Sequence, residues 1–241
     1  GDTLRFTTNP SGSVTLAGSD LDIDDEDNLI LRAARLLQRD NLGAHIELNK
    51  RIPVGGGLGG GSSNAATTLL ALNQLWNLGL TNSRLRSLGR QLGADVPVFI
   101  GGYSAWAEGV GEELTPVELP ADWFLVIAPD CHISTAEIFS HEQLTRDTSP
   151  IKIAAFFEGH SRNDCQQLVR SLYPEVDNAL KWLEKFGEAK LTGTGACVFA
   201  SFEREEQARS ALGQMPASMR GIVARGLNES PVLRALAEAK S

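Results

Sequence analysis

Hydrophobic and polar positions along the chain follow two periods, and both are clear around a stretch rich in glycine. From His45 to Ile52 apolar and polar side chains alternate, the period-2 pattern of a half-buried strand. From Ala65 to Trp76 the apolar residues recur at spacings of four, three and four, the pattern of one stripe on an amphipathic helix. Between them, Pro53 to Asn64 contains six glycines among twelve residues. The predicted order is therefore strand, glycine loop and helix.

The same two periods predict the elements that flank this motif in the first half of the chain. An acidic run from Asp20 to Asp27 has the composition of a solvated turn and a helix N-terminus. Val96 is expected to be extended because Pro97 follows it. Strands are expected at 3–8 and 13–17, joined by a turn at 9–12, and at 97–100, 103–107 and 114–119, with a turn at 108–112. Helices are expected at 29–39 and from Thr81 or Asn82 to Gln91, where Gly93 ends the second helix.

A change of composition marks a predicted domain boundary near residue 114. Pro116, Pro120 and Pro129 flank the apolar strand 123–128, which we expect to begin a second domain. The predicted domains are therefore 1–114 and 115–241. In the second we expect helices near 153–158, 163–172 and 176–186, a second glycine motif at 191–199 leading into an apolar strand, a charged helix at 203–212, a strand at 221–225 and a terminal helix at 230–239.

Composition and charge exclude several functional classes. The 241 residues are 42% hydrophobic and 22% charged, as in an ordinary globular enzyme. The net charge of -8 argues against a nucleic-acid-binding surface that covers the molecule, and no basic run with interleaved aromatic residues is present. No stretch has the length and apolarity of a membrane span, and no signal peptide is evident. The expected location is the cytoplasm. The widely spaced Cys131, Cys165 and Cys197 are expected to be reduced thiols, and the scattered histidines (His45, His132, His141 and His160) make a structural zinc site improbable.

The glycine loop has the properties of an anion site. Glycines allow close backbone approach, and the helix that follows turns its unpaired N–H groups and positive dipole end toward a ligand. Ser62, Ser63 or Asn64 can serve as the N-cap. No Asp or Glu lies between Glu47 and Asp95, an interval that contains Lys50, Arg51, Arg84, Arg86 and Arg90. Phosphate is therefore the expected ligand, and a plain surface turn is the alternative.

Three familiar phosphate motifs do not fit this loop. Gly55, Gly57 and Gly60 satisfy G-x-G-x-x-G, but the acidic residue that would hold a ribose about 20 positions later is missing. The P-loop requires a lysine before the serine, whereas this loop has Gly61-Ser62. The His-Arg-Asp and Asp-Phe-Gly sequences of protein kinases do not occur. The glycine pattern is therefore the only support for the hypothesis that the protein is a dinucleotide-dependent oxidoreductase.

The loop closely resembles the second motif of the GHMP kinases, a family of small-molecule kinases. The similar residues are the segment Gly57 to Ala66, followed by Gly93-Ala94-Asp95-Val96-Pro97, and the resemblance extends from Asp2 to about Pro231. The turn Gly193-Thr194-Gly195, weak evidence by itself, resembles the third motif of the family. The resemblance implies an α+β fold of two domains, each a mostly antiparallel sheet packed with helices, with the active site in the cleft between them.

The resemblance also implies a reaction and its partners. The donor would be ATP with Mg²⁺. Within the family, the longer glycine segment is most similar to the branch that acts in non-mevalonate isoprenoid biosynthesis, whose acceptor is the 2-hydroxyl of a cytidine-diphosphate-linked methylerythritol. Another GHMP kinase with a different alcohol acceptor, and a non-catalytic nucleotide-binding fragment, remain alternatives. We expect a monomer or weak homodimer, with no nucleic acid or membrane partner.

The site residues implied by the resemblance follow. Asp95, which by itself could be a turn residue, would be the catalytic base and contact the substrate. Phe139, alternatively a core phenylalanine, would stack on the cytosine, and Ser62 or Ser63 would reach the metal. The ATP-binding residues would be Pro53, Val54, Gly55, Gly56, Gly57, Leu58, Gly59, Gly60, Gly61, Ser62, Ser63, Asn28 and Lys50, and the other substrate-binding residues Thr135, Gly193, Thr194 and Gly195.

One part of the family pattern is missing from the printed sequence. The resemblance implies an N-terminal segment with a Lys-x-Asn motif, whose lysine pairs with the catalytic aspartate, and a Tyr-His pair that holds the cytosine. Neither precedes Gly1. Either the segment is left out of the printed sequence or the protein is truncated. For a truncated protein we expect weak or no turnover, because Asp95 would lack that lysine and the pyrimidine pocket would lack one wall.

Overall fold

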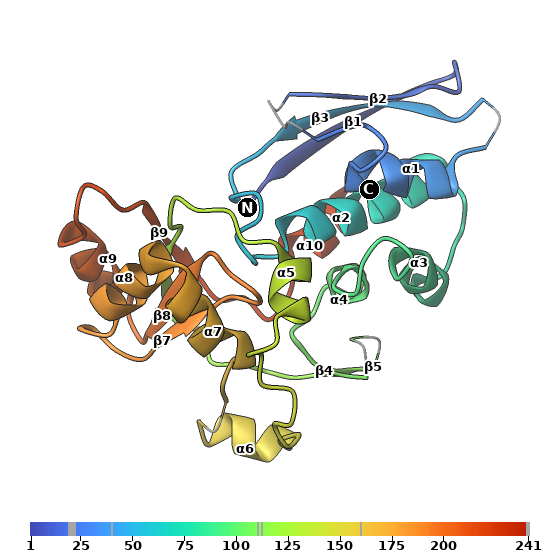
Figure 1. Cartoon of the computed structure of the whole chain (residues 1–241). Coiled ribbons are helices and arrows are strands. Elements are labelled where there is room, and N and C mark those ends of the chain that lie inside the picture. The colour runs from blue at the N-terminus through green and yellow to red at the C-terminus, as the bar shows by residue number, and fades with distance from the viewer. Residues whose placement is uncertain (19–22, 40, 110, 112, 160, 240–241) are drawn as a thin grey trace. The chain divides into compact units, whose positions relative to one another are not determined.

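The computed structural model describes residues 1–18, 23–39, 41–109, 111, 113–159 and 161–239. The chain forms two compact units, each discontinuous in sequence (Figure 1). The first unit contains residues 1–52, 59–119 and 227–241, and the second contains residues 53–58 and 120–226. This division differs from the expected ranges in three respects: the boundary falls at Leu119, the last residues join the first unit, and part of the glycine loop joins the second.

The first unit contains a sheet of three described strands in the order β1-β3-β2. They are β1 (Thr3–Asn9), β2 (Val14–Ala17) and β3 (Gly43–Asn49). β1 is antiparallel to β3, whereas β2 is parallel to it. The prediction of two strands at 3–8 and 13–17 is confirmed, but they do not form a hairpin. Instead, β3 lies between them. At the start of β3, Gly43 pairs with Asn9 on one side, and the amide of Ala44 donates to the carbonyl of Ser13 on the other.

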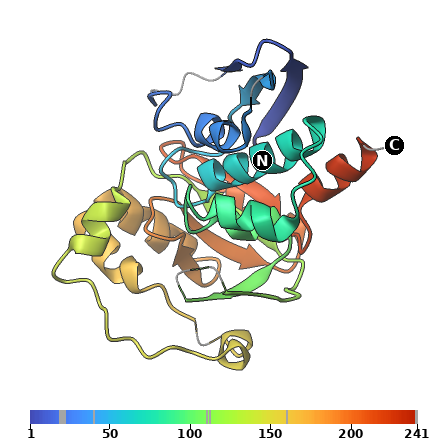
Figure 2. The same cartoon turned by 90° about the vertical axis from the view of Figure 1, so that its right-hand side faces the viewer.

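Helices α1 (Leu29–Leu37) and α2 (Gly60–Leu75) lie against this sheet (Figure 2). The stripe predicted from the sequence is buried, from Ala65 at 0% exposure to Trp76 at 8%. It packs against α1 and against Ile46 and Leu48 of β3, which are also buried. Two predicted bounds shift: β3 starts earlier and ends at Asn49, and α2 starts five residues before Ala65.

The rest of the first unit contains α3 (Asn82–Gly89), α4 (Val96–Gly101), the hairpin of β4 (Ala105–Glu108) and β5 (Glu113–Pro116), and α10 (Pro231–Glu238). The strand predicted at 97–100 and the extended Val96 are wrong. Pro97 lies in the first turn of a helix, where its missing N–H costs nothing, and Gly102 ends that helix at φ 74°. The side chain of Leu233 covers Gly102, and Gln74 donates to the carbonyl of Leu236, so α10 packs on the first unit.

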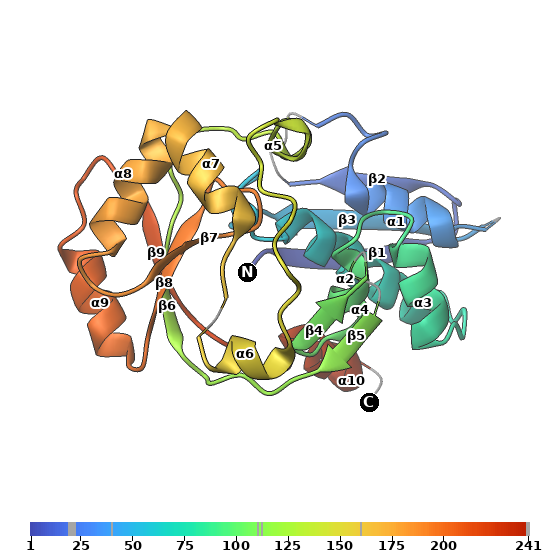
Figure 3. The same ribbon diagram turned by 60° about the horizontal axis from the view of Figure 1, so that its bottom comes forward.

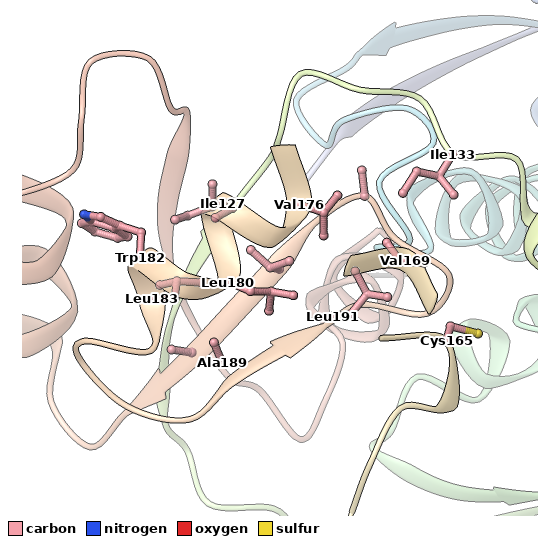
Figure 4. Packing of buried hydrophobic residues seen from close by; sticks show 14 of the residues in the cluster. Ile127, Ile133, Cys165, Val169, Val176, Leu180, Trp182, Leu183, Ala189 and Leu191 are labelled. Carbon is pink, nitrogen blue, oxygen red and sulfur yellow. The ribbon is translucent and has the colours of Figure 1, made fainter. Parts of the chain in front are cut away.

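The second unit is built on an antiparallel sheet with the described strand order β7-β8-β6-β9. Helices α7, α8 and α9 cover one face of it (Figure 3). Figure 4 shows the core between helices and sheet, in which side chains of α7 and α8 pack with those of β6 and β7, and Val169, Leu180 and Leu183 are fully buried. On the opposite face, the rings of Phe124 and Phe199 meet edge to face at 5.9 Å. The elements are β6 (Trp123–Ile127), α7 (Asp164–Leu172), α8 (Pro174–Leu183), β7 (Ala189–Leu191), β8 (Val198–Phe202), α9 (Glu205–Gly213) and β9 (Gly221–Arg225).

Two short helices complete the second unit, α5 (Thr135–Ser140) and α6 (Ile153–Phe157). Three predictions involve residues outside the described ones: part of the acidic run (20–22), part of the turn at 108–112, and His160. Among the helices of the described ranges, none combines the length and apolar character needed to cross a bilayer.

Candidate active site

The first turn of α2 has free backbone donors. Gly59 is its N-cap, in the left-handed conformation at φ 67°, so the prediction of a serine or asparagine cap is wrong. The ring of Phe99 lies where a β-carbon on Gly59 would be, with Cζ 2.9 Å from that position, which explains a cap without a side chain. Ser63 is the first residue whose amide bonds within the helix, donating to the carbonyl of Gly59 at 2.8 Å. The amides of residues 60–62 therefore have no helical partner, as expected at a helix N-terminus.

Ser62 and Ser63 lie in this same turn, both half-buried. Within the described part of the chain neither hydroxyl has a hydrogen-bond partner. A β-carbon on Gly93 would lie 3.8 Å from the Oγ of Ser62, so the predicted Gly93-Ala94-Asp95 segment passes beside the turn. Asp95 itself is exposed, at the N-terminus of α4, and its side chain caps nothing. Two predicted site segments thus meet within the first unit.

Asn28 has a structural role that the sequence reading did not include. Its Oδ1 accepts a 3.0 Å hydrogen bond from the amide of Ile30 and so caps α1, while its side chain is only 6% exposed overall. Its Nδ2 donates to no group in the described ranges. The neighbouring Leu29 reaches the glycine loop, since a β-carbon on Gly61 would meet its Cδ1 at 3.4 Å. The residue next to Asn28 therefore contacts the first turn of α2, and the Nδ2 group of Asn28 has no acceptor among the described residues.

Lys50 is held in an ion pair rather than being a free cation. Its Nζ lies 2.7 Å from Oδ2 of Asp2, and the Asp2 side chain is 2% exposed. Burial raises the pKa of Asp2, but hydrogen bonds from the amide of Ile52, from Lys50, from the amide of Arg51 and from Asn64 together lower it below its ordinary value. Folding therefore places the carboxylate of Asp2 beside Lys50, although the sequence from Glu47 to Asp95 contains no acidic residue between these two. Asp2 was not predicted as a site residue.

The predicted basic cluster is also divided in space. Arg86, on α3, places its Nη2 against Gly101 at the end of α4, where helix carbonyls attract a cation. It does not point to the glycine loop, and its Nε is buried without a hydrogen-bond partner among the described residues. The sequence placed Arg86 and Lys50 in one basic interval, but in the structure Lys50 pairs with Asp2 after the end of β3 and Arg86 contacts Gly101.

The first half of the glycine loop is bound by the second glycine motif, and both lie in the second unit. The amide of Ala196 donates to the carbonyl of Gly55, and that of Cys197 to the carbonyl of Gly56. Oγ1 of Thr192 also donates to the carbonyl of Gly56, at 2.7 Å. The two loops singled out from the sequence are therefore hydrogen-bonded neighbours. Thr192 is a residue that the sequence reading quoted within the motif without assigning it a role.

The predicted substrate residues Thr135 and Thr194 also lie together. Their hydroxyls are 2.9 Å apart, and Thr194 is buried. The turn that carries Thr194 is supported by Asn163, whose Nδ2 donates to the carbonyls of Leu191 at 3.1 Å and Gly193 at 2.7 Å. Sequence reasoning placed Asn163 only at the start of a helix, where its Oδ1 does cap α7. Its second role depends on a contact across 30 positions.

Phe139 is 58% exposed at the surface of α5. The alternative of a core phenylalanine is therefore wrong. An aromatic ring of this size left in water is available for stacking on a planar ligand. Its assignment to a base remains a prediction.

The three cysteines are free thiols, as predicted. Burial raises the pKa of Cys197 to about 11, with a smaller contribution from the electrostatic interaction with Cys131. This thiol, which lies beside Gly56, therefore stays protonated at neutral pH. No group of three His, Cys, Asp or Glu side chains suited to a metal ion occurs among the described residues.

Comparison with known proteins identifies the class first. Residues 28–103 match the GHMP kinases N terminal domain, and residues 140–221 match the GHMP kinases C terminal. The fold agrees with that of the mevalonate kinase of Methanococcus jannaschii, with a TM-score of 0.66 over 94% of this chain and 89% of that one, at 18% identity. The α+β fold with two GHMP-type domains is therefore confirmed, and the chain is an ATP-dependent phosphotransferase.

Relatives with higher identity narrow the class. The chain is 55% identical over 236 residues to the 4-diphosphocytidyl-2-C-methyl-D-erythritol kinase of Alkalilimnicola ehrlichii, covering 97% of this chain and 81% of that protein. It is 52% identical to the enzyme of the same name from Marinobacter nauticus, over 100% and 86%. A crystal structure of 4-(cytidine 5'-diphospho)-2C-methyl-D-erythritol kinase matches with a TM-score of 0.77 at 31% identity, over 93% and 85%. The chain belongs to the 4-diphosphocytidyl-2-C-methyl-D-erythritol kinase family of GHMP kinases.

Proposed function

We propose that the protein transfers the γ-phosphoryl group of ATP to the 2-hydroxyl of 4-diphosphocytidyl-2-C-methyl-D-erythritol, a step of non-mevalonate isoprenoid biosynthesis. The observation that carries this proposal is the open first turn of α2 in a chain 55% identical to a kinase named for this acceptor. Three amides that have no partner within the described chain, at the positive end of a sixteen-residue helix, suit the charge of a polyphosphate.

The glycine loop supplies binding and charge stabilisation in this mechanism. The amides of Gly60, Gly61 and Ser62 would donate to phosphate oxygens, and the missing β-carbons would allow the phosphates to approach the backbone. Such preorganised donors act without rearranging when negative charge develops on the transferring group. The Nδ2 of Asn28, whose neighbour Leu29 contacts Gly61, would be a further donor for the nucleotide. Pro53, Val54 and Leu58 would line the remainder of the loop.

Asp95 is the proposed general base. Its exposed carboxylate would accept the proton of the acceptor hydroxyl as that oxygen bonds to the γ-phosphorus and the bond to the ADP oxygen breaks. General-base assistance of this kind is worth roughly 10²- to 10⁴-fold in rate. The position of Asp95, in the segment that passes beside Ser62, supports this role within the first unit.

The residues of the first turn also fit a Mg²⁺ ion bound together with the nucleotide. Mg²⁺ takes oxygen ligands and keeps several waters, so one protein hydroxyl and the phosphate oxygens are a suitable set. The hydroxyls of Ser62 and Ser63 have no partner among the residues that the structure describes, and either could hold the ion. When bound, the ion would offset the charge of the phosphate oxygens.

Recognition of the acceptor is assigned to the second unit. Phe139 would stack on the cytosine, and the paired hydroxyls of Thr135 and Thr194, on a turn shaped by Gly193 and Gly195, would contact the substrate. We further propose that the protein acts in the cytoplasm as a monomer or weak homodimer. Three thiols without a disulfide support a reducing compartment.

The test is an assay of ADP release by the full-length protein with ATP, Mg²⁺ and a panel of alcohols. We expect turnover with the cytidyl acceptor and none with homoserine or mevalonate derivatives. Asp95→Asn should reduce kcat by at least about 100-fold, the lower range for loss of a general base. Glu206→Gln, which also removes an exposed carboxylate from the first turn of a helix, is the matched control and should retain full activity. Turnover of another alcohol, or an unchanged rate in Asp95→Asn, would contradict the acceptor or the base respectively.

A further inference from the structure

Asp2 has an unusually complete set of hydrogen bonds. Its Oδ1 accepts from the amides of Arg51 at 2.7 Å and Ile52 at 2.8 Å. Its Oδ2 accepts from Nζ of Lys50 at 2.7 Å and from Nδ2 of Asn64 at 2.9 Å. The side chain is 2% exposed. A buried carboxylate is costly unless such donors compensate for its lost hydration, so each of the four contacts is needed.

The four donors belong to the two ends of the glycine loop. Arg51 and Ile52 are the last residues before the loop, and Asn64 is its last residue, on α2 one turn after Gly60. Lys50 connects the two ends a second time, because its Nζ also donates to the carbonyl of Ile52 and would lie 3.2 Å from a β-carbon on Gly60. One carboxylate therefore holds the beginning of the loop against its end, and all five groups belong to the first unit.

We propose that Asp2 is a positioning residue for nucleotide binding, which fixes the two ends of the glycine loop so that the amides of residues 60–62 keep the arrangement that phosphate requires. This role rests on the proposed function of that loop. A glycine-rich segment loses more conformational entropy on ordering than other sequences. If a folded carboxylate has already fixed its ends, binding of the nucleotide has less ordering to do, and affinity is higher.

The chemistry of the four contacts requires a carboxylate at this position. All four partners are donors, and an ionised carboxylate offers only acceptors. Asparagine has the same shape but would turn an NH₂ group toward two of those donors. In Asp2→Asn the contact with Asn64 and Lys50, or that with the two amides, is therefore lost. Exchanging the partners offers a rescue, because Asn64→Asp places an acceptor opposite the new amide.

The alternative is that Asp2 contributes only to the stability of the first unit. A stability effect would lower the thermal midpoint and would leave the affinity of the folded protein for nucleotide unchanged. Asp177 provides the comparison, since it is also ion-paired, with Lys181 and Arg170, but lies on α8 of the second unit. Asp177→Asn should destabilise the protein without changing nucleotide affinity.

The experiment measures ADP binding by calorimetry at a temperature where circular dichroism shows each variant folded. We expect Asp2→Asn and Asn64→Asp each to weaken ADP binding about tenfold or more, as loss of a charged hydrogen bond does. The double variant Asp2→Asn/Asn64→Asp should recover most of that loss, and Asp177→Asn should bind ADP normally. In turnover assays, KM for ATP should rise in Asp2→Asn while KM for the acceptor stays constant.

The outcomes separate this role from the proposed function. Normal ADP affinity in Asp2→Asn, an equal loss in Asp177→Asn, or no recovery in the double variant would overturn the positioning role alone. Absence of turnover on the cytidyl acceptor with intact ADP binding would overturn the acceptor and leave the role of Asp2 standing. No ADP binding by the unsubstituted protein would overturn both.

Discussion

Oγ1 of Thr192 donates a 2.7 Å hydrogen bond to the carbonyl oxygen of Gly56, across 136 positions of the sequence. The same hydroxyl lies 3.0 Å from the carbonyl of Cys197, so it connects the first half of the glycine loop to the turn of the second motif. The amides of Ala196 and Cys197 add two further bonds to the same loop. The conformation of residues 55–57 is therefore determined by residues that come much later in the chain.

This packing predicts that Gly57 cannot be replaced. Gly57 has φ 70°, and a β-carbon there would collide with the carbonyl oxygen of Thr192. Gly79 has nearly the same φ of 66° but open space around it, which makes it a matched control. We expect Gly79→Ala to lose about 1–2 kcal/mol of unfolding free energy through backbone strain alone. Gly57→Ala should lose clearly more in the same urea titration, and equal losses would show that the loop can move away from Thr192.

A second prediction concerns Phe139. Because this ring is 58% exposed, Phe139→Ala should hardly change the thermal midpoint. If the ring stacks on the cytosine, KM for the acceptor should rise about tenfold to a hundredfold, the effect of losing about 1–3 kcal/mol of base stacking. Phe157→Ala removes a ring of similar exposure, 53%, from α6 and should leave KM for the acceptor unchanged. A rise in KM for ATP rather than for the acceptor would contradict the assignment.

A third prediction distinguishes the two serines of the first turn of α2. Ser62→Ala and Ser63→Ala should both fold normally, because neither hydroxyl bonds to another group of the described chain. The variant that lacks the metal-binding serine should need a roughly tenfold or more higher Mg²⁺ concentration for half of its maximal rate. Ser83→Ala, in the exposed first turn of α3, is the control. Identical Mg²⁺ curves for all variants would exclude both serines as ligands.

A fourth prediction concerns acid. Burial raises the pKa of Asp2, but its hydrogen bonds together lower it below the ordinary value. The pKa of Asp177 is also lowered, mainly by a hydrogen bond from Lys181 and then by one from Arg170. A carboxylate with a lowered folded-state pKa stabilises the protein fully above its unfolded value of 3.8, and the contribution is lost as the pH falls through the folded value. The difference in unfolding free energy between the unsubstituted protein and Asp2→Asn should therefore shrink below about pH 4. A difference that grows on acidification would contradict the lowered pKa.

Local patterns in the sequence were sufficient for the elements whose periodicity reflects burial. The stripe from Ala65 to Trp76 and the strand around Ile46 predicted α2 and β3, because side chains on one face must leave water together. The strand predicted at 97–100 was wrong, because several β-branched and aromatic residues outweighed the proline before them and the glycine after them. Those two residues were the better signal for a short helix.

Contacts between distant positions were not accessible in the same way. Asp2 and Lys50 are separated by 48 residues, so no window of the sequence shows that the lysine beside the glycine loop is already paired. The support of the second motif by Asn163 likewise depends on the fold of the second unit. The resemblance of the glycine motifs identified the family because it depends on consecutive residues. The roles of single side chains at the site remain predictions.

The discontinuous units have a consequence for synthesis of the protein on the ribosome. Residues 53–58 belong to a unit whose other residues begin at Pro120, and the first unit is completed by residues 227–241. A nascent chain that has emerged only to Leu119 lacks both Thr192 and α10, so neither unit can be complete at that stage. Because long-range contacts form late and slowly, we expect the glycine loop to acquire its final shape only after Thr192 and α10 have been synthesised, and chains interrupted earlier to be unable to bind nucleotide.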